Sequence, residues 1–279
     1  MRITFDCVDF TYPSQASSVP VLRELCLECE TTSLMGICGT TGSGKSTFIK
    51  HLNGLLKPTG GNVLIDGEGI HRSKSSLSAI RQRIGMTFQF PERQLFGRTV
   101  REELSHTLER RGLGESEIED LIVSASDALE FDLDALQHRS PFSLSRNEQR
   151  ILSIAVMLAL QPELLILDEP TAGMDRANAI RLLDLLKTLH DEHRTQIVLV
   201  SHDLELLLKY AHSLIVLHDG RAILARTPQE IERMFQQFRQ CGLLLPPVYQ
   251  TLQLVREQDD TVSLPDGTSL DEIVWSFTR

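Results

Sequence analysis

Hydrophobic residues follow two different patterns along this sequence, and each pattern predicts a different kind of strand. Residues 2–10 and 22–30 alternate apolar and polar positions, which is typical of strands with one face in water. Residues 164–167 and 197–200 are instead continuous apolar runs, as expected of strands covered on both faces of a parallel sheet. A helical pattern over residues 177–190 separates these two runs. The sequence therefore predicts a strand-helix-strand unit in an α/β fold.

The rest of this domain adds further strands and a helical segment. Between residues 102 and 137 the pattern is helical and rich in polar residues. We expect a domain over residues 1–228, with a helical insertion at about residues 91–160. Its other elements are strands at residues 33–38, 62–66, 213–218 and 221–225, and helices at residues 46–55 and 151–160.

Residues 229–279 differ in pattern and predict a small C-terminal domain. A helix is expected over residues 230–240, and the pair Pro246-Pro247 ends it. A last short helix is expected over residues 269–277. Between them lies an apolar stripe at helical spacing, formed by Val248, Leu252 and Val255.

Composition limits the kinds of partner. The chain has 279 residues, of which 41% are hydrophobic, and a net charge of -10, which disfavours a surface that wraps nucleic acid. No apolar run reaches the roughly 20 residues needed to span a bilayer. The longest, residues 151–160, contains Ser153, and Met1 leads directly into a strand rather than a signal peptide. If the protein works at a membrane, we expect a partner to supply the span.

The five cysteines are scattered and do not predict a metal site. Cys26 and Cys29 lie three positions apart on a predicted strand, which places their side chains on opposite faces. The sequence offers no second Cys/His pair to complete a tetrahedral site. We therefore expect reduced, small and buried cysteines at positions 7, 26, 29, 38 and 241.

A glycine-rich loop lies between the predicted strand at residues 33–38 and the helix at 46–55. Its sequence fits the phosphate-binding pattern G-x-x-x-x-G-K-[ST], in which glycines let backbone N–H groups converge on phosphates at a helix N-terminus. Lys45 is expected to reach the β- and γ-phosphates, and the Ser46 hydroxyl to ligate magnesium. The alternative is a glycine-rich turn with an exposed lysine that binds no phosphate. The loop consists of Gly39, Thr40, Thr41, Gly42, Ser43, Gly44, Lys45, Ser46 and Thr47.

Two acidic residues, Asp168 and Glu169, follow the buried strand at residues 164–167. The carboxyl edge of a parallel sheet is where ligands bind in such folds. We expect Asp168 to hold magnesium and Glu169 to act as the general base on the attacking water. Taken alone, two acids at a strand end could also be a helix cap.

These motifs, with four others in the same order, resemble the ATPase subunit of an ATP-binding cassette (ABC) transporter over roughly residues 2–228. Tyr12 resembles the aromatic residue that stacks on adenine, although it could be an ordinary strand aromatic. Gln89 resembles the glutamine that senses the γ-phosphate and magnesium. Asp175 lies in Gly173-Met174-Asp175, which resembles the loop that communicates between two facing subunits. His202, in Ser201-His202-Asp203, resembles the switch histidine.

The resemblance implies a fold and a set of cofactors. The fold is a P-loop NTPase core of the ABC type, with a mixed sheet, antiparallel N-terminal strands and a helical insertion. The cofactors are ATP and Mg²⁺, with Ser46, Gln89 and Asp168 at the metal. His202 is expected to contact the γ-phosphate and, with Glu169, to form the catalytic pair.

A second set of motifs resembles the energy-coupling factor (ECF) transporters within this family. That resemblance implies import of a vitamin or other micronutrient at the cytoplasmic face of the membrane. It also implies three partners: a paralogous ATPase, a transmembrane scaffold subunit and a substrate-capture membrane subunit. The alternative for residues 91–96 is an apolar turn that enters a helix. The motifs are Pro91, Glu92, Gln94, Leu95 and Phe96, then Ser140-Pro141-Phe142, and in the tail Pro246-Pro247 and Leu264-Pro265-Asp266-Gly267.

The chain departs from the family at its signature, Leu-Ser-Gly-Gly-Gln, which donates N–H groups to the nucleotide of the facing subunit. The matching residues are Ser145, Arg146, Asn147 and Glu148. Side chains in place of glycine restrict close backbone approach to a phosphate. Ser145 and Glu148 also form a capping-box pattern, so Ser145 could serve only its own helix. We therefore predict a heterodimer with a paralogue whose signature is intact.

Three other functions are compatible with parts of the sequence. The first is the ATPase subunit of a conventional ABC transporter, against which residues 91–96 and the tail argue. The second is a soluble ABC ATPase that acts on DNA or ribosomes, but the chain lacks the basic surface and long coiled coils typical of these. The third is a regulatory module that binds ATP without hydrolysis, which the presence of Glu169 disfavours.

Overall fold

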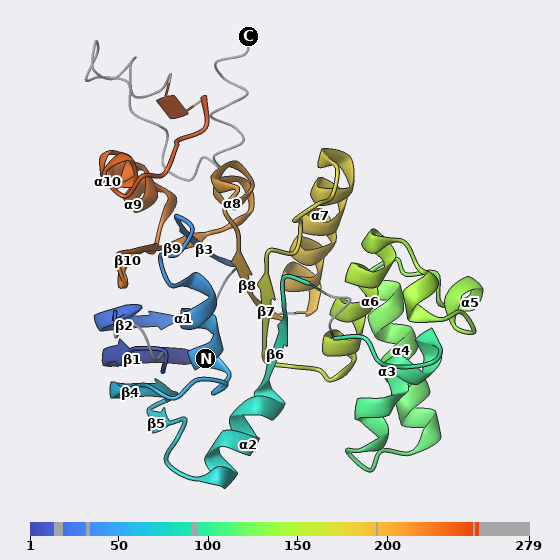
Figure 1. Cartoon of the computed structure of the whole chain (residues 1–279). Helices are drawn as coiled ribbons and strands as arrows, with labels where there is room; N and C mark the ends of the chain where they lie inside the picture. Colours follow the sequence, from blue (N-terminus) through green and yellow to red (C-terminus); the bar gives the residue numbers. More distant parts are fainter. Residues whose placement is uncertain (14–18, 32–33, 91–93, 194, 248, 251–279) are drawn as a thin grey trace.

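The computed structural model describes residues 1–13, 19–31, 34–90, 94–193, 195–247 and 249–250. In these residues the strands form two sheets (Figure 1). The first sheet has the order β2-β1-β4-β5 and is antiparallel throughout. Its strands are β1 (Arg2–Phe10), β2 (Leu22–Glu30), β4 (Gly60–Ile65) and β5 (Glu68–Gly69).

The second sheet has the order β10-β9-β3-β8-β7-β6 and is parallel except for β10, which pairs antiparallel with β9. Its strands are β3 (Met35–Gly39), β6 (Ile84–Thr87), β7 (Leu164–Asp168), β8 (Gln196–Val200), β9 (Ser213–His218) and β10 (Arg221–Ala225). The predicted α/β class with a mixed sheet and antiparallel N-terminal strands is confirmed.

Both faces of the parallel sheet are covered, which explains the continuous apolar runs. On β7, Leu164 and Ile166 pack into the core between the two sheets, and Leu165 and Leu167 pack into the core on the opposite face. The first core is filled by α1 (Lys45–Leu52), where Phe48 stacks on Phe5 at 4.3 Å between ring centroids. The second core includes α7 (Arg176–His193) and α8 (Leu204–Tyr210).

The predicted helical segment forms a group beyond the β6 edge of the sheet (Figure 1). Its last helix, α6, contacts α3, α4 and β6, which ties the group to the core. Within the described residues, no helix is long and apolar enough to cross a membrane. The group consists of α3 (Val100–Glu109), α4 (Glu115–Ala128), α5 (Leu133–Leu136), the short 3₁₀ helix η2 (Pro141–Ser143) and α6 (Arg146–Ala159).

Several elements differ from the sequence-based expectations. The helix expected over residues 230–240 is interrupted at Met234 and forms α9 (Pro228–Arg233) and α10 (Phe235–Gln240). The structure also contains β5, β6, α2 (Lys74–Arg83) and α8, for which the pattern gave no prediction. The apolar stripe from residue 248 and the helix over residues 269–277 lie outside the described residues.

The cysteine prediction is partly wrong. Cys29, Cys38 and Cys241 are buried, but Cys7 and Cys26 are exposed. Cys26 and Cys29 do face opposite sides of β2, as expected from the strand period. Cys7 is exposed because the alternation of β1 is broken there, at an irregularity between Phe5 and Val8.

Candidate nucleotide site

The glycine-rich loop connects β3 to the N-terminus of α1, as the sequence predicted. Gly39, Gly42 and Gly44 all have positive φ, at 154°, 82° and 104°. A Cβ atom on Gly39 would lie 2.4 Å from the carbonyl oxygen of Leu217, so only glycine fits there. A loop of this shape turns backbone N–H groups toward one point at a helix N-terminus, where an anion is stabilised.

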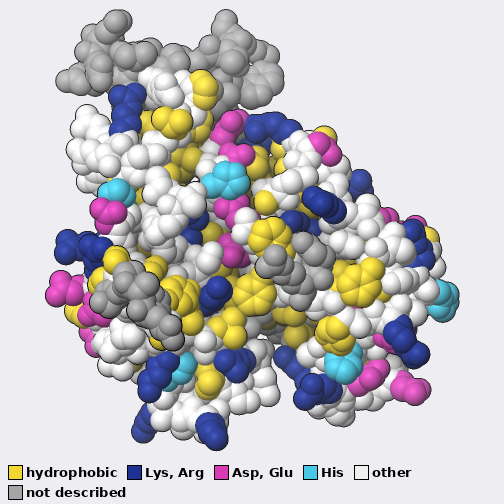
Figure 2. Space-filling model, in the orientation of Figure 1, with side chains coloured by type: hydrophobic (Ala, Val, Ile, Leu, Met, Phe, Trp, Pro, Cys, Tyr) yellow, Lys and Arg dark blue, Asp and Glu magenta, His cyan; other side chains and the backbone are white. Residues whose placement is uncertain are grey.

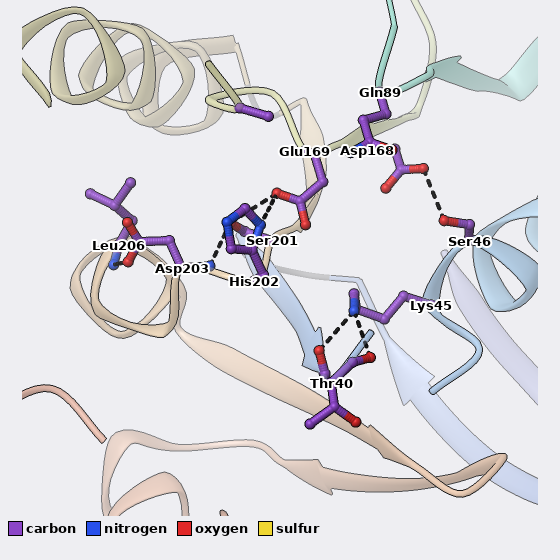
Figure 3. A network of polar contacts seen from close by, with 12 residues as sticks. Thr40, Lys45, Ser46, Gln89, Asp168, Glu169, Ser201, His202, Asp203 and Leu206 are labelled. Atoms are coloured by element: carbon purple, nitrogen blue, oxygen red, sulfur yellow. Dashed lines mark hydrogen bonds and ion pairs between the residues drawn. The ribbon is translucent and has the colours of Figure 1, made fainter. Parts of the chain in front are cut away.

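Lys45 is held over this loop by its own backbone. The Lys45 ammonium donates hydrogen bonds to the carbonyl oxygens of Gly39 at 2.7 Å and Thr40 at 3.1 Å (Figure 3). Because both acceptors belong to the loop, the charge of Lys45 lies where the loop would place phosphates.

Ser46 and Asp168 meet across the site although they are 122 positions apart in the sequence. The Ser46 hydroxyl donates to Oδ2 of Asp168 at 3.3 Å (Figure 3). Burial raises the pKa of Asp168, the neighbouring Glu169 raises it further, and the Ser46 hydrogen bond opposes the shift. A hydroxyl beside a desolvated carboxylate is a donor set that fits a hard cation such as Mg²⁺.

Glu169 has a strained backbone and a fixed side chain. Its φ is 52°, in the left-handed region that costs a residue other than glycine about 1–3 kcal/mol. Its N–H donates to the Val200 carbonyl at 2.9 Å, and its carboxylate Oε2 lies 2.8 Å from Nδ1 of His202. Figure 3 shows His202 and Glu169 pointing toward each other from the ends of β8 and β7. The structure thus brings both predicted catalytic residues together.

The residues predicted to stack on adenine and to sense the γ-phosphate, Tyr12 and Gln89, lie near this loop. The Tyr12 hydroxyl is 3.1 Å from the Thr47 hydroxyl, which ties Tyr12 to α1. Gln89 lies just beyond the carboxyl end of β6. A pocket of about 580 Å³ is lined by Val21, Thr41, Gly42, Gly44, Lys45, Ser46, Thr47, Gln89, Asp168, Glu169 and His202.

The signature residues lie elsewhere, at the start of α6. Ser145 caps this helix, accepting a hydrogen bond from the N–H of Glu148 at 3.3 Å. Glu148 accepts one from the N–H of Ser145 at 2.7 Å, and hydrogen bonds with the Ser145 side chain and then its backbone lower the pKa of Glu148. The capping box is therefore present, and a carboxylate that stays ionised stands at the helix start. Arg146 and Asn147 form the first helical turn with it.

Asp175 caps α7 in a similar way. It accepts hydrogen bonds from the backbone N–H of Asn178 at 3.0 Å and from the Asn178 side chain. A structural role for Asp175 is thus visible within the chain, and its role between subunits stays a prediction.

Arg150 is the residue that sequence reasoning missed. It lies on α6, and its guanidinium donates to three backbone carbonyls: Glu169 at 2.8 Å, Ala172 at 3.2 Å and Gln89 at 3.3 Å. These carbonyls belong to two loops that the sequence separates by about eighty positions. Arg150 thereby fixes the backbone of the predicted base relative to the predicted sensor glutamine.

We expect Arg150→Ala to lower ATP turnover about tenfold or more while ATP binding is retained. The substitution leaves the carbonyl of Glu169 without this charged donor, a loss of about 1.5–3 kcal/mol in positioning. Steady-state ATPase assays and nucleotide titration separate turnover from binding. Arg181→Ala, which removes an exposed arginine paired with Glu130, is the matched control. Equal turnover in both variants would contradict the positioning role.

An exposed apolar surface lies near the insertion. Phe90, Phe96 and Phe142 expose 45%, 59% and 58% of their surface. On the face shown in Figure 2, hydrophobic side chains gather around the boundary between β6 and the helical group. Residues 91–93 of the predicted ECF motif lie outside the described residues. Gln94 accepts a hydrogen bond from the N–H of Phe88 at 3.1 Å, and Leu95 is buried.

Comparison with known proteins places this architecture in a family. Residues 22–172, more than half of the chain, match the family described as ABC transporter. The energy-coupling factor transporter ATP-binding protein EcfA2 of Symbiobacterium thermophilum is 38% identical over 275 residues, which cover 98% of this chain and 94% of that relative. EcfA2 of Enterococcus faecalis is 39% identical over 250 residues, covering 88% and 86%.

Solved structures of ABC proteins share this fold. The structure of cbiO1 from Clostridium perfringens, described as part of the ABC transporter complex cbiONQ, has a TM-score of 0.76 at 28% identity and covers 90% of this chain and 98% of its own. The ATP-binding cassette MJ0796, in a dimeric post-hydrolysis state bound to ADP and Pi, has a TM-score of 0.73 at 26% identity and covers 81% and 98%.

A phosphate-binding loop at the edge of this mixed sheet, with an acidic pair and a histidine beside it, defines an ABC-type ATPase. The chain belongs to the ABC transporter family, and within it to the ATP-binding subunits of energy-coupling factor transporters. The resemblance read from the sequence motifs is confirmed.

Proposed function

We propose that this chain binds ATP with Mg²⁺ and hydrolyses it as one of two facing ATPase subunits of an ECF importer. The observation that carries the proposal is an asymmetry within one chain. Its nucleotide pocket is lined by Lys45, Ser46, Gln89, Asp168, Glu169 and His202, whereas its signature residues cap their own helix. The proposal assigns ATP binding to residues 1–228 and a separate small domain to residues 229–279.

Each group in the pocket has a distinct task in this mechanism. The loop and Lys45 would hold the β- and γ-phosphates, and Ser46, Asp168 and Gln89 would hold the metal. Magnesium, when bound, neutralises charge that develops on the phosphates.

The catalytic pair completes the mechanism. Glu169 accepts the proton of the attacking water, because its carboxylate is fixed next to the phosphate-binding loop. His202 hydrogen-bonds Oε2 of Glu169 through Nδ1 and so orients the carboxylate. Much of the His202 ring remains exposed toward the pocket, where it can contact the γ-phosphate.

The missing half of the site must come from a partner. Residues 145–148 do not line this chain's own pocket, and their capping box places the Glu148 carboxylate at the helix start, where a glycine signature would approach a phosphate. The similar cassette MJ0796 has been solved as a dimer, which supports two facing subunits. A paralogue with an intact Leu-Ser-Gly-Gly-Gln would complete the site formed by residues 39–47.

The test compares ATPase activity of the purified chain alone with that of its mixture with such a paralogue. We expect turnover to rise about tenfold or more in the mixture, because one composite site then has a complete set of phosphate donors. A variant with a rebuilt signature, made by Arg146→Gly, Asn147→Gly and Glu148→Gln, should show higher ATP turnover than the unmodified chain when each is assayed alone. Full, cooperative turnover by the unmodified chain alone would contradict the heterodimer.

The same proposal includes two membrane subunits and a cytoplasmic position at the membrane. The exposed aromatic surface at Phe90, Phe96 and Phe142 supports docking of a transmembrane scaffold, and a separate membrane subunit would capture the vitamin or other micronutrient. The alternative is a conventional ABC transporter with no separate capture subunit. Purification of the intact membrane complex with identification of its subunits distinguishes the two.

A further inference from the structure

Two exposed cysteines lie in contact on the outer face of the antiparallel sheet. Cys7 is on β1 and Cys26 is on β2, 19 positions apart, and their Sγ atoms are 2.7 Å from each other. This separation is less than an ångström longer than a disulfide bond of about 2.0 Å. Neither residue lines the nucleotide pocket.

A β-bulge produces this contact. Phe5 pairs with Leu27 and Val8 with Leu25, so Asp6 and Cys7 together stand opposite the single residue Cys26. In regular alternation Cys7 would share the buried face of Phe5. With φ at 46°, it is turned outward instead, and Val8 is again buried.

The bulge is fixed by the strand on its other side. Gly61 of β4 approaches so closely that a Cβ atom there would lie 2.2 Å from the carbonyl oxygen of Cys7 and 2.4 Å from that of Asp6. On β2, Glu24 also has positive φ, at 43°, and its N–H donates to Asp9 at 2.9 Å. The two sulfurs are therefore held together by the backbone of three strands rather than by a chance rotamer.

We propose that Cys7 and Cys26 are a thiol–disulfide site that a small-molecule disulfide oxidises reversibly. In the first step a thiolate attacks the small disulfide, which forms a mixed disulfide and releases one small thiol. In the second step the other cysteine attacks the protein sulfur of this mixed disulfide, and a second small thiol leaves. Two protein thiols and one small disulfide thus become one protein disulfide and two small thiols.

Hydrogen bonds join the two thiols to each other and to the backbone of β2. Cys26 donates to the Glu24 carbonyl at 3.2 Å, and Cys7 lies against the Cys26 sulfur. The hydrogen bond to Cys26 is the largest cause that raises the pKa of Cys7 to about 11, and the charges of Asp6 and Glu24 add to it. Cys7 therefore holds its proton more tightly than an ordinary thiol in the reduced pair.

The disulfide would close a loop that carries part of the nucleotide pocket. Between the two cysteines lie Tyr12, which is tied to Thr47, and Val21, which lines the pocket and donates its N–H to Phe10 at 2.7 Å. A cross-link between the two strands lowers the conformational entropy of the unfolded chain. We therefore expect the melting temperature to rise by about 5 °C.

The test treats the full chain with glutathione disulfide, quenches it in acid, alkylates the remaining thiols and maps the cysteines by mass spectrometry. We expect a peptide pair joined through Cys7 and Cys26 that dithiothreitol separates, with the buried Cys29 and Cys38 alkylated only after unfolding. Cys7→Ser should instead retain a glutathione adduct on Cys26, and its melting temperature should not rise on oxidation.

Two results would overturn the proposal. One is stable glutathione adducts on both cysteines of the unsubstituted chain without a cross-link. The other is complete alkylation of both thiols after exposure to the oxidant. A folded Cys7→Ser variant, checked by its melting temperature, ensures that the comparison reports on the thiol pair.

Discussion

Glu169→Gln is expected to lower ATP turnover by about 10²–10⁴-fold while ATP binding is preserved, since this is the range contributed by a positioned general base. Glutamine retains the size of the side chain and can still contact Nδ1 of His202, but it cannot accept a proton from water. The backbone contacts of residue 169 with Val200 and Arg150 do not involve the carboxylate and remain. Single-turnover hydrolysis with the paralogue present, together with nucleotide binding, measures both quantities.

A matched substitution controls for the loss of one negative charge. Glu192 is an exposed carboxylate on α7, and Glu192→Gln should leave turnover unchanged. If Glu169→Gln hydrolysed ATP at the rate of the unsubstituted chain, Glu169 would not be the base.

The second large effect is expected for Lys45→Ala, which should weaken ATP binding about 100-fold, equivalent to the loss of charged hydrogen bonds to phosphate. Lys45 lies over the loop because its ammonium binds two loop carbonyls, so alanine removes both the charge and this tether. Isothermal titration with ATP and Mg²⁺ gives the dissociation constant, and thermal unfolding in the absence of nucleotide shows whether the fold is preserved.

Lys57→Ala is the control for net charge, because Lys57 is an exposed lysine in the segment after α1. Similar ATP affinity for the two alanine variants would show that Lys45 does not bind ATP.

The parts of the site that could be predicted are those whose geometry follows from neighbours in sequence. The loop at residues 39–47 depends on glycines with positive φ between a strand and a helix, and both flanking elements were visible in the hydrophobic pattern. Asp168 and Glu169 follow a fully buried strand, so their place at the sheet edge was also predictable. The capping box at Ser145 and Glu148 needs only the spacing of two residues on one helix turn.

Other elements lacked a local signal. Strand β6 has four residues, too few for a reliable period, and α2 contains mostly polar residues with Ile80 as its buried position. Helix α8 has leucine at four of its seven positions, and all four are buried. Because the helix is covered on several sides, its apolar residues do not form a single helical stripe.

Arg150 and the cysteine pair could not be predicted for a different reason. Arg150 binds backbone carbonyls, which every residue possesses, so its partners leave no trace in the sequence. The bulge at Cys7 depends on the register between β1 and its two neighbours, and on the room that Gly61 of β4 provides. Register between strands far apart in sequence is a tertiary property.

Helix α6 begins at the signature and, about one turn later, carries Arg150. In the proposed dimer, the start of this helix faces the partner's nucleotide. Arg150 donates a hydrogen bond to the backbone carbonyl of this chain's own Glu169. Both features thus lie within the first two turns of one helix. A tilt of this helix start would therefore displace the signature and the backbone of Glu169 together.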